Sequence, residues 1–269
     1  MKFRMAFPLL AILCWGLVAL LAGILPLEPD RINLEKVLVP PDWQSWLGYD
    51  DLGRAIVDRL VMGARTSLLV AICVVFISAV FGTLLGILAG FIGGRWDQCF
   101  VIVLDIFMAF PGILLAIALA GLLGPGILNA VIALSIVGWV GFARLARAQT
   151  LSIKHREHIM AAHALGTRGW RIGRQHILPL VTAPLIVEAT FAVAATVIAE
   201  ASLSFLGLGV QAPAASWGSM IREGTRYMLV APHMVLAPGI AICVVVLSIN
   251  LLGDQFRDRI DVRQLKPLS

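Results

Sequence analysis

The sequence predicts an all-α integral membrane protein with six transmembrane helices. Of its 269 residues, 59% are hydrophobic and 14% are charged, whereas a soluble globular domain carries about 25% charged residues. Residues 7–25 and 66–94 contain no charged side chain. Each run is long enough for a helix to cross the membrane, which takes roughly 18–20 residues. Strands of a membrane barrel would instead alternate in segments of about 10 residues.

The apolar runs place the six helices, in order, at about 7–26, 66–92, 98–123, 126–145, 177–199 and 232–252. Lys2 and Arg4 before the first run are typical of a signal peptide. However, this run is longer than the apolar part of a signal peptide, and no small-residue cleavage site precedes Pro26. We therefore expect residues 1–26 to form the amino terminus and an uncleaved first helix.

Residues 27–65 form a polar connection whose first part is rich in proline. Its second part predicts an amphipathic helix, with Ile56 and Leu60 on one face and Asp51 as the N-cap. The cysteines lie in apolar runs without the spacing of metal ligands, so we expect them to be small buried side chains rather than disulfides. They are Cys14, Cys73, Cys99 and Cys243.

Basic residues set the predicted orientation, because cytoplasmic loops of membrane proteins are enriched in Lys and Arg. Segment 144–176 carries seven basic residues and a single acid. We therefore expect loop 146–176, the carboxyl-terminal tail 253–269 and both termini to be cytoplasmic, and residues 27–65 to be extracytoplasmic. The net charge of +5 is then explained by anionic membrane lipid, with no need for a nucleic acid.

Residues 158–179 form a basic, jointed connection between two apolar runs. Helix-forming residues around Ala161 and Ala162 precede Gly166, which permits a backbone geometry that other residues resist. Arginines then recur every three residues on one face of a second short helix; they are Arg168, Arg171 and Arg174. Two interpretations stay open: an interfacial helix that contacts lipid phosphates, or a docking surface in which a partner closes on the small alanine pair.

This connection resembles the cytoplasmic EAA loop of ABC importer permeases. The residues that carry the resemblance are Glu157, Ala161, Ala162, Gly166, Ile177, Leu178 and Pro179. The resemblance implies a coupling helix that fits a cleft of an ATP-hydrolysing subunit, with Arg168 and Arg171 flanking the contact. Met160 stands where the EAA triplet has Glu, whereas Glu157 matches the version common in the peptide and nickel branch. We therefore expect docking without a salt bridge from position 160.

Three further blocks resemble the same branch, in the same order along the chain. They are "LGYDDLGRAIVDRLVMGARTSL" at 47–68, "EASLSFLGLGVQAPAASWGSMI" at 200–221 and "NLLGDQFRDRIDVR" at 250–263. The resemblance covers roughly residues 45–265. It implies a permease-like fold of the type I ABC importers, with a five-helix core at 66–252.

The resemblance also implies the partners of the chain. They are a second homologous permease subunit, two ATP-binding subunits that carry ATP and Mg, and an extracytoplasmic solute-binding protein that delivers peptides, nickel or related small solutes. Such a transporter lies in the bacterial inner membrane and works by alternating access. The chain itself is then expected to bind no cofactor and to have no enzymatic activity.

The residues themselves support the last point, because no phosphate-binding G-x-x-x-x-G-K-[ST] motif is present. Energy would have to come from a partner. One alternative is a self-contained secondary transporter or channel, but such proteins typically show internal repeats, and the halves of this sequence show no convincing similarity. Another alternative is a scaffold protein without a pore, against which the acids inside the apolar runs argue mildly.

Ionisable residues at membrane depth are costly and usually functional. Asp105 lies in the third predicted helix, and we expect it to form a structural pair with Arg144 or a cap, with a role in the transport pathway as the alternative. Glu188 lies near the middle of the fifth helix, either hydrogen-bonded between helices or facing the pore to help a cationic group pass. Glu200 is expected to cap or pair near the external mouth. Trp217 fits an interfacial position and a gate equally well.

Overall fold

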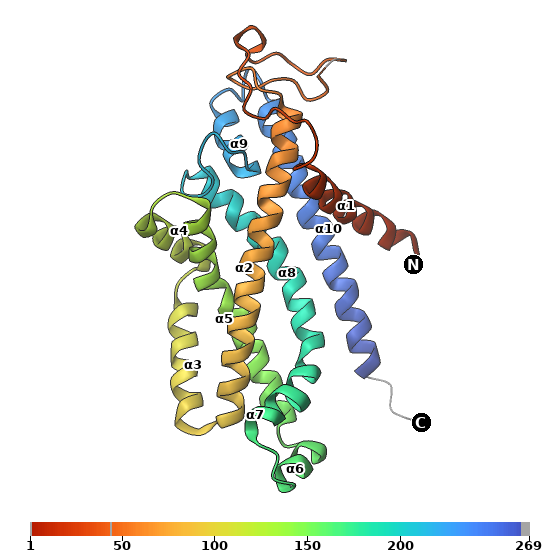
Figure 1. The fold of residues 1–269 in the computed structure, drawn as a ribbon, viewed down its shortest axis with the longest axis vertical. Helices are drawn as coiled ribbons and strands as arrows, with labels where there is room; N and C mark the ends of the chain where they lie inside the picture. Colours follow the sequence, from red (N-terminus) through yellow and green to blue (C-terminus); the bar gives the residue numbers. More distant parts are fainter. Residues whose placement is uncertain (1, 44, 265–269) are drawn as a thin grey trace.

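The computed structural model describes residues 2–43 and 45–264, which form an elongated bundle of helices (Figure 1). No strand occurs among these residues, and an isolated bridge joins Tyr49 to Ala55. The long helices are α1 (Lys2–Leu21), α2 (Ile56–Ile92), α3 (Gly94–Ala109), α4 (Gly112–Leu123), α5 (Ile127–Ile153), α8 (Leu178–Phe205) and α10 (His233–Gln264). The short ones are η1 (Leu34–Lys36), α6 (Glu157–Ala164), α7 (Gly169–Ile172), the π-helical turn η2 (Gly173–Ile177) and α9 (Trp217–Thr225).

Figure 1 shows α9 and the long connection after α1 at one extremity of the bundle, and α6 and α7 at the other. We call residues 27–59 and 206–232 the α9 end, and residues 154–177 the α6 end. The all-α prediction is confirmed. Within the described residues, four helical stretches are long and apolar enough to cross a membrane: Ile56–Ile92, Ile127–Ile153, Gly169–Phe205 and His233–Asp258. The apolar part of α1, Ala6–Leu21, is shorter, so the count of six spans stays a prediction.

The third predicted helix is wrong as a continuous span, because α3 and α4 meet at an angle of 86°. Pro111 causes the break: it lacks a backbone N–H, and its ring disfavours a helical conformation at the preceding residue. Phe110 is extended accordingly, with φ −99° and ψ 139°. The sequence run looks continuous because apolar residues occupy both sides of the break.

One other predicted boundary is also wrong. The stretch expected to be a separate amphipathic helix is the start of α2, with Ala55 rather than Asp51 as the N-cap, because no proline interrupts residues 56–92. Helix α10 continues beyond the predicted sixth span, through much of the predicted tail, to Gln264. Residues 265–269, including Lys266, lie outside the described residues. The four cysteines are free, as expected, but they are exposed rather than buried.

Glycines determine how closely α2 and α5 pack. Gly82, Gly86 and Gly90 recur every four residues and therefore share one face of α2. A Cβ at Gly82 would lie 2.4 Å from the Trp139 carbonyl oxygen, and one at Gly86 only 2.3 Å from that of Ala143. Such small-residue stripes let helix backbones approach each other inside a membrane, where dispersion contacts replace the hydrophobic effect.

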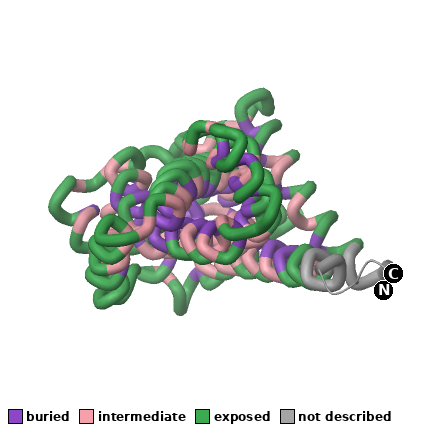
Figure 2. The backbone as a smooth tube through the Cα atoms, turned by 90° about the horizontal axis from the view of Figure 1, so that it is seen from below, coloured by how far each residue is buried: buried purple, intermediate pink, exposed green. Residues whose placement is uncertain are grey.

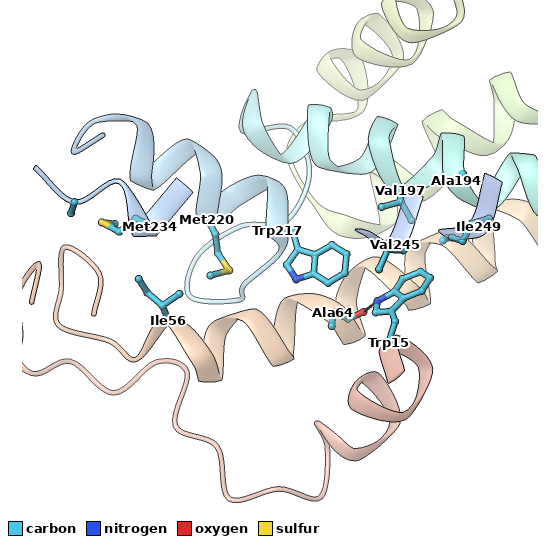
Figure 3. Close-up of a cluster of buried hydrophobic side chains, with 12 residues drawn as sticks. Trp15, Ile56, Ala64, Ala194, Val197, Trp217, Met220, Met234, Val245 and Ile249 are labelled. Carbon is cyan, nitrogen blue, oxygen red and sulfur yellow. Dashed lines mark hydrogen bonds between the residues drawn. The ribbon is translucent and has the colours of Figure 1, made fainter. Parts of the chain in front are cut away.

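Buried side chains form separate clusters along the bundle, and Figure 2 shows them toward its middle, with exposed residues along its outer sides. The cluster toward the α9 end joins α1, α2, α8, α9 and α10. Figure 3 shows Trp15 and Trp217 beside each other within it, with ring centroids 6.0 Å apart. The cluster toward the α6 end joins α2, α5 and α8 to α6, α7 and η2. The two ends are thus each tied to the same long helices.

Candidate functional site

The α6 end has the jointed geometry that the sequence predicts. Helix α6 ends at Ala164, and Gly166 follows with φ +79°, a left-handed conformation that favours glycine. Helix α7 and the π-helical turn η2 then lead directly into α8. Pro179 is the second residue of α8; because η2 continues into α8 without a break, its missing N–H falls inside the helical stretch Gly169–Phe205, directly after the π-helical turn.

Apolar side chains attach this end to the bundle. Ile159 of α6, Ile172 of α7 and Ile177 of η2 are each at most 2% exposed and pack into the cluster shared with α2, α5 and α8. Ala162 is also buried, at 9% exposure. Of the alanine pair, Ala161 is therefore the residue accessible to a partner, and docking there stays a prediction.

The opposite face of the α6 end is open. Glu157, Ala161, Arg168 and Arg171 are exposed, as is Pro179, while Leu178 is partly buried. Sequence patterns did not predict that large apolar side chains are also exposed at this end; they are Met160, Leu165 and Trp170, exposed to 51%, 86% and 73%. A Leu and a Trp within a basic, polar stretch are the sequence feature that could have indicated this. Exposed apolar side chains among basic residues are typical of a protein–protein contact.

The predicted pair of Asp105 with Arg144 is wrong. Both side chains are exposed, no ion pair joins them among the described residues, and Arg144 Nη1 instead lies 3.8 Å from Met108 Sδ. The ion pair between α3 and α5 instead joins Arg147, one turn after Arg144, to Asp97, about two turns before Asp105. Both Nε and Nη2 of Arg147 donate to the Asp97 carboxylate, Nη2 to Oδ2 at 2.7 Å. The arrangement of α3 beside α5 decides this choice, which sequence spacing does not specify.

Glu188 is half-buried and lines a partly open cavity between α2, α4, α5 and α8. We predicted two positions for Glu188, hydrogen-bonded between helices or facing a pathway, and in the structure its side chain lies at the wall of this cavity. Its carboxylate has no hydrogen bond or ion pair among the described residues. The same cavity contains Ser78, whose hydroxyl is buried and also lacks a partner.

Glu200 and Trp217 are packed into the bundle near the α9 end. Glu200 is 1% exposed, and its carboxylate accepts hydrogen bonds from Ser67 of α2 at 3.0 Å and from Ser204 at 2.7 Å. Trp217 is 2% exposed and donates its ring N–H to the Leu60 carbonyl oxygen at 3.0 Å. Glu200 thus pairs as expected, whereas Trp217 is a core residue and not an interfacial one.

A buried ion network at the α9 end was missed by the sequence analysis. Arg54 binds Asp50 at 2.6 Å and Glu223 of α9 at 3.0 Å. Arg59 of α2 binds the same Glu223 at 2.8 Å. Both arginines are at most 7% exposed, so the network fixes the connection after α1 onto α9. Glu223 lies more than 160 residues from both Arg54 and Arg59, and no local sequence pattern reveals such distant pairs.

These features coincide with a known family. The sequence profile of the family described as "Binding-protein-dependent transport system inner membrane component" matches residues 82–266. The chain is 43% identical to the dipeptide transport system permease protein DppC of Alkalihalophilus pseudofirmus, over 94% of this chain and 84% of that protein. It is 42% identical to the glutathione transport system permease protein GsiD of Pectobacterium atrosepticum, over 86% of this chain and 75% of that protein.

The fold agrees with this similarity. A chain of the MetNI methionine ABC transporter, solved in an inward-facing conformation, matches with a TM-score of 0.63 at 20% identity. The match covers 76% of this chain and 97% of that one. The sequence profile spans more than half of the chain, and the two permeases are related to it over most of their length. The chain therefore belongs to the family of binding-protein-dependent transport system inner membrane components, the permease subunits of ABC importers.

Proposed function

We propose that the chain is the membrane subunit of a peptide importer, and that the α6 end couples it to separate ATP-hydrolysing subunits. Relatives at 43% and 42% identity are named for dipeptide and glutathione transport, which supports peptides over nickel or other small solutes. The remaining partners are a second, homologous permease subunit and an extracytoplasmic binding protein. ATP and Mg are bound by the ATPase subunits, and this chain binds no cofactor.

The observation that carries this proposal is the two-sided character of the α6 end. Buried isoleucines fix this end to α2, α5 and α8, whereas Ala161, large apolar side chains and arginines are exposed on it. A small side chain at Ala161 lets a partner approach the backbone of α6 closely. A displacement of α6 by that partner is then transmitted to the long helices through the isoleucine contacts.

The proposed coupling is an alternating-access cycle. ATP binding closes the two ATPase subunits and displaces α6, and Gly166 takes up the change of direction between α6 and α7. The bundle then opens toward the binding protein, and hydrolysis resets it. The energy that shifts the equilibrium is the difference in ATP affinity between the two states.

The proposed location is the bacterial inner membrane, with the α6 end and both termini in the cytoplasm. The concentration of Lys and Arg in segment 144–176 supports this orientation. Helix α10 ends toward the same side as α6 in Figure 1, which is consistent with a cytoplasmic carboxyl terminus. The α9 end then faces the binding protein.

Co-purification tests the proposal. The chain is expressed with its genetically neighbouring ATPase subunits and second permease, extracted in detergent and isolated through a tag on this chain. We expect ATPase subunits to co-purify with the unmodified chain and to be lost with Ala161→Trp, because an indole on the open face of α6 blocks close approach.

Ala214→Trp is the matched control, since Ala214 is also exposed but lies at the α9 end. It should retain the ATPase subunits. Co-purification of the Ala161→Trp complex in full yield, with normal ATP-driven dipeptide uptake, would rule out docking through α6.

A further inference from the structure

The cavity that Glu188 lines has a volume of about 290 Å³ and is a partly open pocket between α2, α4, α5 and α8. Small and aliphatic side chains form most of its wall, and its polar side chains are Ser78, Glu188 and Thr196. The Thr196 hydroxyl is satisfied, because it donates to the Ala192 carbonyl oxygen at 2.7 Å. Glu188 and Ser78 therefore provide the unsatisfied polar groups of an otherwise apolar chamber.

Two glycines of α5 make room for these groups. A Cβ at Gly138 would lie 2.7 Å from Ser78 Oγ, and a Cβ at Gly141 would lie 2.8 Å from Glu188 Oε1. The glycines are three residues apart and so lie on one face of α5, separated by a rise of about 4.5 Å. The hydroxyl and the carboxylate thus lie against neighbouring positions of a single helix face, although they come from α2 and α8.

Neither group has a partner within the described chain, and Ser78 is buried whereas Glu188 is half-buried. Ser78 is 2% exposed, and its hydroxyl has no hydrogen-bond partner within the described chain. No basic side chain of the described residues pairs with Glu188. A buried polar group without a partner is unfavourable, and an acid at membrane depth usually has a function. The arrangement therefore favours a ligand that brings a positive charge and hydrogen-bond donors into an apolar space.

A primary ammonium group has these properties, because it carries a positive charge and three donors and no acceptor. It can donate to the Glu188 carboxylate and to the Ser78 hydroxyl oxygen while the apolar wall contacts the carbon skeleton. A divalent metal ion fits poorly: Ca²⁺ takes about six to eight oxygen ligands, and Ni²⁺ binds imidazole well. No His or Cys lines this cavity.

We propose that the cavity binds the amino-terminal ammonium group of the transported peptide through Glu188 and Ser78. This inference rests on the proposed function and specifies the chemistry that the permease itself recognises. It implies that the permease, in addition to its binding protein, discriminates peptides with a free amino terminus from blocked ones.

Cysteine modification in the assembled transporter tests the local charge without requiring transport. The four native cysteines are replaced by serine, and Ala192→Cys places a thiol on the cavity wall, one helical turn after Glu188. Rates of modification are measured with cationic aminoethyl methanethiosulfonate and with neutral methyl methanethiosulfonate. We expect Glu188→Gln to lower the ratio of cationic to neutral rates by about tenfold and to leave the neutral rate unchanged, which also shows that the cavity is intact.

Asp105→Asn is the control, because its exposed carboxylate lies outside the cavity wall, and it should leave the ratio unchanged. In a second arm, saturating L-alanyl-L-alanine is expected to protect the thiol from the neutral reagent. N-acetyl-L-alanyl-L-alanine should not protect, and Glu188→Gln and Ser78→Ala should each weaken protection by the free dipeptide.

An unchanged ratio in Glu188→Gln, an unreactive Ala192→Cys, or equal protection by the two peptides would each overturn the inference. The proposed function fails differently: the unmodified complex would then import no dipeptide with ATP, whatever the ratio of labelling rates. The two proposals are therefore separable.

Discussion

The two ends of the bundle are built in opposite ways. At the α9 end, side chains far apart in sequence bind one another directly: Arg54 and Arg59 share Glu223, and Trp217 donates to the Leu60 carbonyl oxygen. A capping box between Ser216 and Ser219 begins α9. At the α6 end, Lys154 donates to the Gly90 carbonyl oxygen at 2.9 Å, no side chain of the described residues 155–176 makes a hydrogen bond or ion pair, and buried isoleucines provide most of the attachment.

This difference suggests different tasks. Hydrogen-bonded ion pairs fix one geometry, because their distances and angles are specific, and they give the α9 end a defined shape. Apolar contacts have no preferred direction, so a helix held by them can pivot while it stays attached. An end that moves against a partner needs the second kind of attachment. The predictions below test this comparison, from the largest expected effect to the smallest.

Gly166→Pro should block the proposed pivot. Proline requires φ near −65°, whereas Gly166 has φ +79° and donates its N–H to the His163 carbonyl oxygen at 3.0 Å. We expect ATP-driven dipeptide uptake to fall strongly, because hinge substitutions change turnover, and the Tm of the purified chain to fall as well, because proline at this φ costs about 1 kcal/mol or more. Gly173→Ala is the control, because Gly173 is helical and its surroundings are open. Normal uptake with normal ATP turnover would contradict the pivot.

Glu223→Gln should disrupt the α9 end, because it leaves two buried arginines with too little negative charge. Removing one partner of a buried ion pair costs about 3 kcal/mol, so we expect a clear drop in Tm in detergent. Glu28→Gln is the matched control: its pair with Arg31 is 60–73% exposed, and exposed pairs contribute little. Equal Tm values for the two variants would show that the network does not hold this end.

Gly218→Ala should separate α9 from α8. The added Cβ would lie 2.2 Å from the Ala201 carbonyl oxygen and 2.6 Å from its Cα, and backbone atoms cannot move aside as a flexible side chain can. Overpacking of this kind costs about 2 kcal/mol, measurable as a lower midpoint of thermal unfolding. Gly239→Ala in α10 adds the same methyl group where nothing lies within 4 Å, and it should be neutral.

Trp217→Phe should have the smallest effect on the Tm, since it keeps most of the buried ring and removes the hydrogen bond to the Leu60 carbonyl oxygen. Such a bond contributes about 1 kcal/mol. The corresponding change at the α6 end, Trp170→Phe, should leave the stability of the isolated chain unaltered, because Trp170 is 73% exposed. A larger Tm shift at Trp170 than at Trp217 would reverse the comparison between the ends.

Sequence patterns predicted the α6 end well because its structure is local. Gly166, the alanine pair and Pro179 act within a few residues of chain, through backbone conformation and helix termini. The same approach failed for Asp105, because the partner of an acid on α3 depends on the rotation of α3 against α5, and Arg147 binds Asp97 instead. Sequence patterns also did not predict that Leu165 and Trp170 are exposed, because the exposure of an apolar side chain depends on how the helices pack.

The sequence by itself determined the helical, membrane-embedded class, the jointed loop and the family, because apolar runs and glycine or proline positions act on the chain locally. The tertiary structure alone decided which helices touch, and with that the broken third span, the Glu223 network and the placement of Glu188 and Ser78 in one cavity. The physical reason is that side chains far apart in sequence meet only after helix backbones have packed. In this bundle, glycines such as Gly86, Gly138 and Gly141 set how closely those backbones and side chains approach.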